Sequence, residues 1–83
     1  MNDYSRICGE QLKKLREYKR LSLRELAYIS DISFTAIRNY ELGNRSMDID
    51  QIDILCKALG KDTREFLNEC FDIIQTGKGG QTK

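Results

Sequence analysis

The stretch LSLRELAYISDISFTAIRNYELGNR, residues 21–45, decides the fold of this chain. Ser22 followed by Glu25 is a capping-box pattern, which predicts the start of a short helix because the two side chains satisfy backbone amides that lack a helical partner. The apolar pattern breaks at residues 30–33, and a second short helix is expected over residues 34–42, before a glycine and an asparagine that end it. Two short helices separated by about three residues predict a helix-turn-helix unit.

Three further helices are expected around this unit. Over residues 3–19 one apolar stripe recurs at helical spacing, formed by Ile7, Cys8, Leu12, Leu15 and Tyr18. Two more capping patterns open helices over residues 48–60 and 62–74. No stretch alternates with period two for long enough to predict a strand. The sequence therefore predicts an all-α domain of five helices over residues 1–75, followed by a flexible tail over residues 76–83.

The composition argues against several classes of function. The chain has 83 residues and contains no proline, tryptophan or histidine. Without histidine it has no imidazole to activate a nucleophile or to complete a Cys/His zinc site, so an enzyme is not expected. No apolar run approaches the roughly 18 residues of a membrane span, and nothing near the N-terminus resembles a signal peptide, which predicts a cytoplasmic protein. The three cysteines, Cys8, Cys56 and Cys70, are expected to be reduced apolar side chains, and no metal, cofactor or small-molecule effector is expected.

Charge is distributed unevenly along the chain. The net charge is +1, from 14 Lys and Arg against 13 Asp and Glu. Residues 1–45 carry nine basic and six acidic residues, a charge of +3. Residues 46–72 carry three basic and seven acidic residues, a charge of −4, and residues 73–83 add two lysines. This division favours a domain that places its amino-terminal half on a polyanion such as double-stranded DNA.

The two runs Leu21–Ala27 and Ser33–Arg45 resemble the Cro and lambda-repressor-like (XRE) family of DNA-binding domains. The resemblance extends over residues 7–67, about three quarters of the chain. It implies a compact lambda-repressor-like domain of five helices, in which the second and third helices form the helix-turn-helix. In such units the first turn of the second short helix presents side chains to base edges in the major groove.

The resemblance also implies which residues face the groove. Phe34 would touch a thymine methyl, although a contact with a protein is an equally strong alternative for this side chain, and Arg38 would reach either a guanine or a phosphate. The full set of base-contacting residues that it implies is Ser33, Phe34, Thr35, Arg38 and Asn39.

Residues at the rim of the unit are expected to hold the DNA backbone, through side chains or through amides at the start of a helix. This phosphate-contacting set is Lys13, Leu23, Arg24, Asn44, Arg45 and Ser46. The resemblance further implies that Arg16 pairs with Glu41 as an internal brace that does not read DNA.

The last expected helix carries an apolar stripe wider than one small core needs. Phe71 and Ile74 are expected to be exposed and to form a homodimer contact, with the alternative that this helix simply closes the domain. A two-fold dimer would place two recognition helices about 34 Å apart, which matches a palindromic operator.

Together these features predict a sequence-specific, homodimeric transcriptional regulator, in its simplest form a repressor. Two alternatives stay open. One is the antitoxin of a toxin–antitoxin pair, in which the acidic half or the last helix binds a toxin. The other is a helical protein-interaction module without specific DNA binding, with Phe34 and Leu23 as contact residues.

Overall fold

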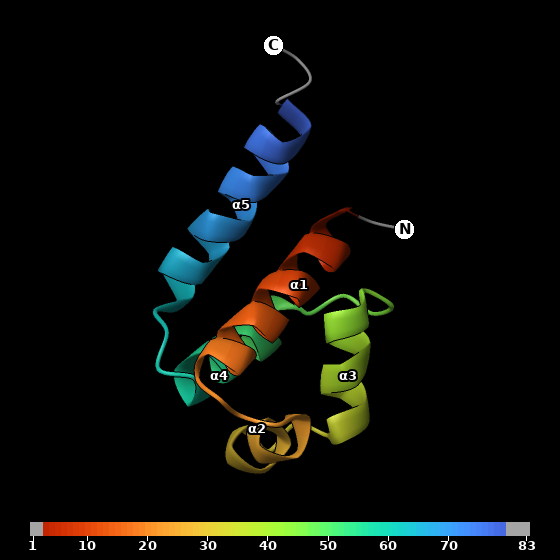
Figure 1. The fold of residues 1–83 in the computed structure, drawn as a ribbon, viewed down its shortest axis with the longest axis vertical. Helices are drawn as coiled ribbons and strands as arrows, with labels where there is room; N and C mark the ends of the chain where they lie inside the picture. Colours follow the sequence, from red (N-terminus) through yellow and green to blue (C-terminus); the bar gives the residue numbers. More distant parts are fainter. Residues whose placement is uncertain (1–2, 80–83) are drawn as a thin grey trace.

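The computed structural model describes residues 3–79, and within them the regular elements are all helices joined by short loops, as the sequence predicts (Figure 1). Its elements are α1 (Asp3–Tyr18), α2 (Leu23–Ser30), α3 (Phe34–Leu42), α4 (Ile49–Ala58) and α5 (Thr63–Gly79). Within the same residues, no helix has the length and apolar character needed to cross a membrane.

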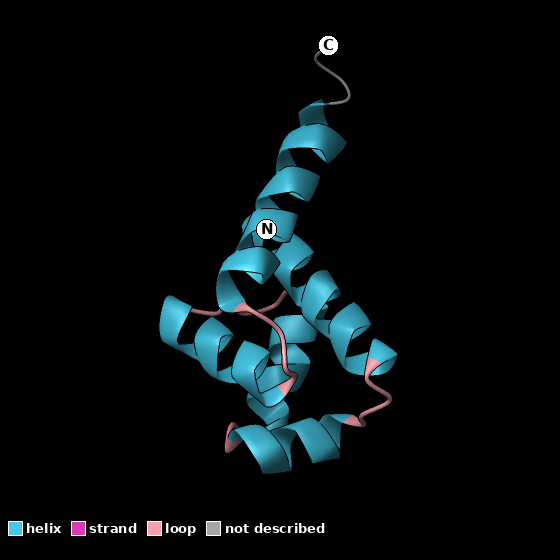
Figure 2. Ribbon diagram, turned by 90° about the vertical axis from the view of Figure 1, so that its left-hand side faces the viewer, coloured by secondary structure: helices cyan, strands magenta, loops and turns pink. Residues whose placement is uncertain are grey.

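Helix α1 organises the domain by packing against both α3 and α5, while α2 packs on α3 and α4. Figures 1 and 2 show α5 running antiparallel to α1 and projecting past the rest of the molecule at its carboxyl end, with α2 at the opposite end. The core draws on all five helices, and burying each large aliphatic side chain stabilises the fold by roughly 1.5–3 kcal/mol. Its most deeply buried members are Leu12, Leu26, Ile37, Leu55, Cys56 and Cys70.

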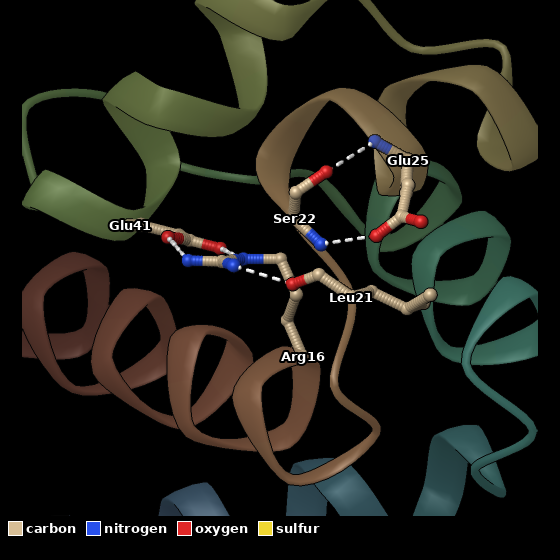
Figure 3. Close-up of polar contacts among 5 residues, drawn as sticks. All are labelled: Arg16, Leu21, Ser22, Glu25 and Glu41. Carbon is tan, nitrogen blue, oxygen red and sulfur yellow. Dashed lines mark hydrogen bonds and ion pairs between the residues drawn. The ribbon is translucent and has the colours of Figure 1, made fainter.

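Four of the helices begin where a side chain accepts a hydrogen bond from a backbone amide in the first turn. Ser22 and Glu25 form a complete capping box: the Glu25 amide donates to the Ser22 hydroxyl at 3.0 Å, and the Ser22 amide donates to the Glu25 carboxylate at 2.7 Å (Figure 3). At the start of α3 the Ser33 hydroxyl accepts from the Ala36 amide at 3.1 Å. The carboxylates of Asp48 and Asp62 accept in the same way from the amides three residues ahead. All four caps are local patterns, which is why the sequence locates the helices.

The helix ends use left-handed residues, and two of these are not glycine. Gly43 and Gly60 have φ angles of 79° and 69°, in the region that glycine adopts without steric cost. Asp31 ends α2 at φ 60°, as its place in the turn predicts. Arg20 ends α1 at φ 61°, where no sequence signal indicates a left-handed residue. Asp31 and Arg20 therefore hold backbone strain that glycine would not.

Gly9 lets two helices approach closely. It is buried in α1, and a Cβ atom at this position would lie 2.0 Å from the carbonyl oxygen of Tyr40 in α3. Only a residue without a side chain fits between the two backbones at this distance. Gly9 therefore sets how closely α3 packs on α1, and no local pattern in the sequence indicates this contact.

Three expectations for the ends of α1 and α5 are wrong. Tyr18 belongs to the expected apolar stripe of α1 but is 81% exposed, because it lies in the last turn of that helix. Ile74 is half-buried against the core rather than exposed. Residues 76–79 are helical where a flexible tail is expected, and the Thr76 hydroxyl donates to the Asp72 carbonyl at 2.7 Å, one turn back along the helix. Residues 80–83 lie outside the described part of the chain.

Candidate nucleic-acid interface

Helix α3 has one buried face and one face turned to solvent. Ala36, Ile37 and Tyr40 are buried, which fixes the helix on the core. Thr35 and Arg38 are exposed on the opposite face, and Asn39 is half-buried beside them. The expected groove-facing residues thus gather on the outer side of α3. Ser33 differs from the other expected base-contacting residues, because its hydroxyl already accepts a hydrogen bond from the Ala36 amide at the start of α3.

An internal clamp ties α3 to α1. The pair that the resemblance implies is present: the Arg16 Nε donates to one Glu41 carboxylate oxygen at 2.7 Å and its Nη2 donates to the other at 2.9 Å (Figure 3). The Arg16 Nη1 also donates to the carbonyl of Leu21, just before α2, at 2.7 Å. The side chains of Arg16 and Glu41 are only 9% and 5% exposed, and their hydrogen bonds raise the pKa of the guanidinium above its usual value. One buried cation therefore joins α1, the chain entering α2, and the end of α3.

Arg24 of α2 lies over the aromatic ring of Phe34 at the start of α3. The centre of the guanidinium is 5.2 Å from the ring centroid, within the range of a cation–π contact. Phe34 is half-buried rather than fully exposed, partly for this reason. An open hollow of about 450 Å³ lies beside the pair, lined also by Tyr28, Asp31 and Ser33. Arg24, which is expected to contact phosphate, and Phe34, which is expected to contact a base, therefore lie in direct contact.

A second stack lies at the other end of α3. The guanidinium of Arg45 lies over the ring of Tyr40, 5.6 Å from its centroid. Asn44 beside it is exposed. Ser46 is also exposed, but its hydroxyl makes a short hydrogen bond with the buried Ser5 hydroxyl of α1. Of the three expected phosphate contacts after α3, the Ser46 side chain is therefore the one already bonded within the protein.

Helices α1, α2 and α3 surround a further hollow of about 190 Å³. It brings Lys13 of α1 and Leu23 of α2 beside Arg38 of α3, as the expected interface requires. Leu42 also lines it and is 53% exposed, a position that sequence reasoning missed. The helical spacing from Arg38 to Leu42 could have revealed it, because residues four apart share a helix face.

The charged side chains near α3 differ in their pairing. Arg24, Arg38 and Arg45 make no ion pair or side-chain hydrogen bond within residues 3–79. Two nearby acids are engaged elsewhere, Glu41 with Arg16 and Glu25 with the backbone of the α2 cap, while Asp31 is exposed beside Arg24. The interface therefore has three arginines whose N–H donors are free to bind the phosphate groups of a polyanion.

Phe71 and Ile74 lie on α5, on a different part of the molecule from α2 (Figure 1). Phe71 is 47% exposed, and the edge of its ring meets Tyr4 of α1, with centroids 5.9 Å apart. The three cysteines are free thiols: Cys56 and Cys70 are buried, and burial raises the pKa of Cys56 to about 11. Among the residues that the structure describes, no cluster of acidic, cysteine or histidine side chains is suited to hold a metal ion.

Comparison with known proteins places these features in a family. The helix-turn-helix family model HTH_3 matches residues 12–66, which include the whole α2–α3 unit. The control protein C.BamHI of Bacillus amyloliquefaciens is 29% identical over 68 residues, covering 81% of this chain and 84% of that protein. The crystal structure of the restriction-modification controller protein C.AhdI from Aeromonas hydrophila is 31% identical with a TM-score of 0.71, covering 75% of this chain and 94% of that one.

A third relative is much longer. A protein of Thermococcus kodakarensis whose name describes an HTH-type transcriptional regulatory protein is 35% identical over 72 residues. The match covers 87% of this chain but only 21% of that protein, so the chain spans about a fifth of its length. These matches agree with the exposed α3 and its surrounding arginines: the chain belongs to the XRE-type helix-turn-helix family of DNA-binding transcriptional regulators.

Proposed function

We propose that this chain is a sequence-specific repressor that acts in the cytoplasm as a homodimer and binds a palindromic operator through the major groove. The observation that carries the proposal is the set of unpaired arginines around α3, Arg24, Arg38 and Arg45. They flank an exposed helix face, and two neighbouring acids, Glu41 and Glu25, are bonded to Arg16 and to the α2 cap rather than to these arginines. Arginine donors left open on one surface are suited to phosphate and guanine, and the fold supplies no second domain within residues 3–79 for another activity.

Base reading is assigned to the outer face of α3. Arg38 is exposed and reaches out from the middle of the helix, so it is proposed to contact guanine in the major groove. Thr35 offers a methyl or hydroxyl group one turn earlier, and Asn39 is proposed to bind adenine. Ser33 contributes through its position at the start of the helix, since its hydroxyl caps α3.

Phosphate binding is assigned to the rim. Lys13 lies beside Arg38 in the hollow between α1 and α3, and Arg45 and Asn44 follow α3 on the surface. The amides of Leu23 and Arg24 form the open first turn of α2, because the capping box occupies those of Ser22 and Glu25. Ser46 contributes through its backbone in this arrangement, since its hydroxyl is bonded to Ser5.

Dimer formation is assigned to the exposed side of α5. Phe71 and Tyr4 form an exposed aromatic pair, and the half-buried Ile74 lies one turn along the same helix. Burying this surface against a second copy would stabilise a two-fold dimer. Phe71→Asp should convert the dimer to a monomer in sedimentation velocity. Ile54→Asp is the matched control, because Ile54 is an apolar residue of similar exposure on α4, and it should leave the sedimentation unchanged.

The function is tested by mobility shift with the chain's own upstream DNA and with an unrelated sequence of equal length. Specific binding should weaken steeply with salt: a dimer with roughly six to ten phosphate contacts loses about 10³- to 10⁵-fold in affinity between about 50 and 200 mM salt. Weak binding that is equal for both DNAs would overturn the proposal and favour a protein-interaction module. Arg38→Ala should then relax the preference at one base pair by about 1–3 kcal/mol.

The comparisons favour a narrower second candidate. Two relatives are named as control proteins, one of them of a restriction-modification system. If this chain has the same task, its operator should lie upstream of an endonuclease or methyltransferase gene. DNA segments selected by the protein from its own genome distinguish this candidate from a general repressor.

A further inference from the structure

The two arginine–aromatic stacks at the two ends of α3 have different surroundings. Arg24 lies over Phe34, the first residue of α3, and Arg45 lies over Tyr40, in the last turn. In a helix-turn-helix the N-terminal residues of the recognition helix contact base edges in the major groove. Phe34 belongs to that turn, whereas Arg45 follows the end of α3. The two guanidinium groups therefore meet different parts of a bound duplex.

The first stack holds its guanidinium in a defined place. The Arg24 guanidinium and its N–H donors lie over the Phe34 ring, with the guanidinium carbon 5.2 Å from the ring centroid. These donors have no partner within residues 3–79. A planar fork of free donors beside an apolar ring matches the major-groove edge of a guanine next to the methyl group of a thymine.

The hollow beside this stack disfavours a phosphate. Asp31 lines it together with Arg24 and Phe34, and Tyr28 on its rim is 87% exposed. A phosphate entering the hollow would meet the negative charge of Asp31, whereas the edge of a base carries no net charge. The surroundings of Arg45 differ, since it lies on a buried ring at the carboxyl end of α3 and is followed by exposed backbone.

We propose that Arg24 is a specificity-determining residue, which reads a guanine while Phe34 packs against the methyl of a neighbouring thymine. The proposal rests on the DNA-binding function above and changes the role of Arg24 from a backbone contact to a base contact. It keeps Arg45 as a phosphate contact. Phe34 acts both as an apolar contact and as the support that orients Arg24.

The test begins with selection of a preferred site from random duplexes by the wild-type protein. Arg24→Ala, Arg24→Lys and Arg45→Ala are then measured on the preferred site and on every single base-pair substitution of it. Arg24→Ala should lose about 5- to 150-fold of discrimination at one G·C pair and little elsewhere. Arg24→Lys should keep most of the affinity but less of this discrimination, because an ammonium group lacks the rigid planar fork of donors of a guanidinium. Phe34→Ala should weaken the preference at that G·C pair and at a neighbouring T·A pair.

Arg45→Ala provides the matched control, and should weaken binding equally on all sites and reduce the salt slope by about one. The same uniform loss for Arg24→Ala, restored by Arg24→Lys, would overturn the inference and leave the proposed function intact. A wild-type protein that selects no preferred site would overturn both. Thermal denaturation checks that each variant is folded, which is expected because Arg24 and Arg45 are exposed.

Discussion

The helix-turn-helix half, α1 to α3, and the half formed by α4 and α5 use their charges in opposite ways. In the first half an acid is buried against Arg16, while Arg24, Arg38 and Arg45 keep their donors free. In the second half it is the lysines that are paired on the surface: Lys57 binds Asp53 at 2.9 Å, and Lys61 binds Glu69 at 2.9 Å. Residues 46–72 carry three basic and seven acidic residues, so the charge that remains there after pairing is negative.

This difference explains how a chain of net charge +1 can present a surface for a polyanion. The three arginines around α3 keep their donors free partly because two nearby acids are bonded elsewhere, Glu41 to Arg16 and Glu25 to the backbone of the α2 cap. The second half pairs Lys57 and Lys61 with carboxylates and carries an acidic surplus, which DNA would repel. The positions of the charged residues and their ion pairs, rather than the net charge of the chain, therefore orient the domain on DNA.

The largest effect is expected when the internal pairing of the first half is broken. Arg16→Ala leaves the Glu41 carboxylate buried without a partner and releases the Leu21 carbonyl, so it should cost about 3–5 kcal/mol of stability. Lys57→Ala removes an exposed pair in the second half and should change the melting temperature little. Thermal denaturation followed by circular dichroism measures both. Equal losses of stability in the two variants would show that the internal ion pair of the first half contributes no more than the surface pair of the second. Base preference should be unchanged in any Arg16 variant that remains folded.

Gly9→Ala should have the next largest effect. The new Cβ would lie 2.0 Å from the Tyr40 carbonyl oxygen, so α1 and α3 must separate, at a cost of about 1–3 kcal/mol or more. An alanine at an exposed helix position normally stabilises relative to glycine, so the expected sign is the opposite of the intrinsic preference. Glu10→Ala places the same residue on the outer face of α1 and should be nearly neutral. A Gly9→Ala protein of unchanged melting temperature would contradict the close approach of the two helices.

The sequence predicts most helix boundaries because their causes are local. Ser22, Ser33, Asp48 and Asp62 each bond to an amide three residues ahead, and such a pattern is visible in a single chain. The Gly9 contact has no such signal, because it depends on how α3 is placed on α1.

The candidate site was predictable in position but not in its contacts. Arg16 and Glu41 are 25 residues apart, so only the resemblance to a family predicts their pairing. The stack of Arg24 on Phe34 depends on the angle at which α2 meets α3, which neither propensity nor spacing specifies. The charge division of the sequence predicts that the amino-terminal half faces the polyanion, and this stays a prediction. The structure shows that Arg24, Arg38 and Arg45 make no ion pair within residues 3–79.

A smaller effect, of the opposite sign, is expected at the turn between α2 and α3. Asp31 has φ 60°, so Asp31→Gly should relieve about 1 kcal/mol of strain and raise the melting temperature by roughly 4–8 °C. Removing its negative charge should also strengthen DNA binding. Arg20→Gly relieves the same kind of strain at the end of α1 and should stabilise similarly, without that gain in affinity. A lower melting temperature for Asp31→Gly would mean that the aspartate makes a stabilising contact of its own.

The smallest effect concerns the paired charges of the second half. The Thr63 hydroxyl, 2.6 Å from the Asp53 carboxylate, and then Lys57 lower the pKa of Asp53 below its usual value near about 3.9. A carboxyl whose pKa is lower in the folded state stabilises the fold above the unfolded pKa, and this contribution is lost as the pH falls through the folded pKa. Thr63→Val removes the first cause, so the pKa of Asp53 should rise towards the usual value, measured from its carboxyl carbon shift by NMR. The free energy of unfolding of this variant should be lower than that of wild type at pH 7. The difference should shrink in acid, as Asp53 becomes protonated in both proteins. Because Arg24, Arg38 and Arg45 have no such partners, the same change should leave DNA affinity untouched, and a loss of affinity would show that the two halves are coupled.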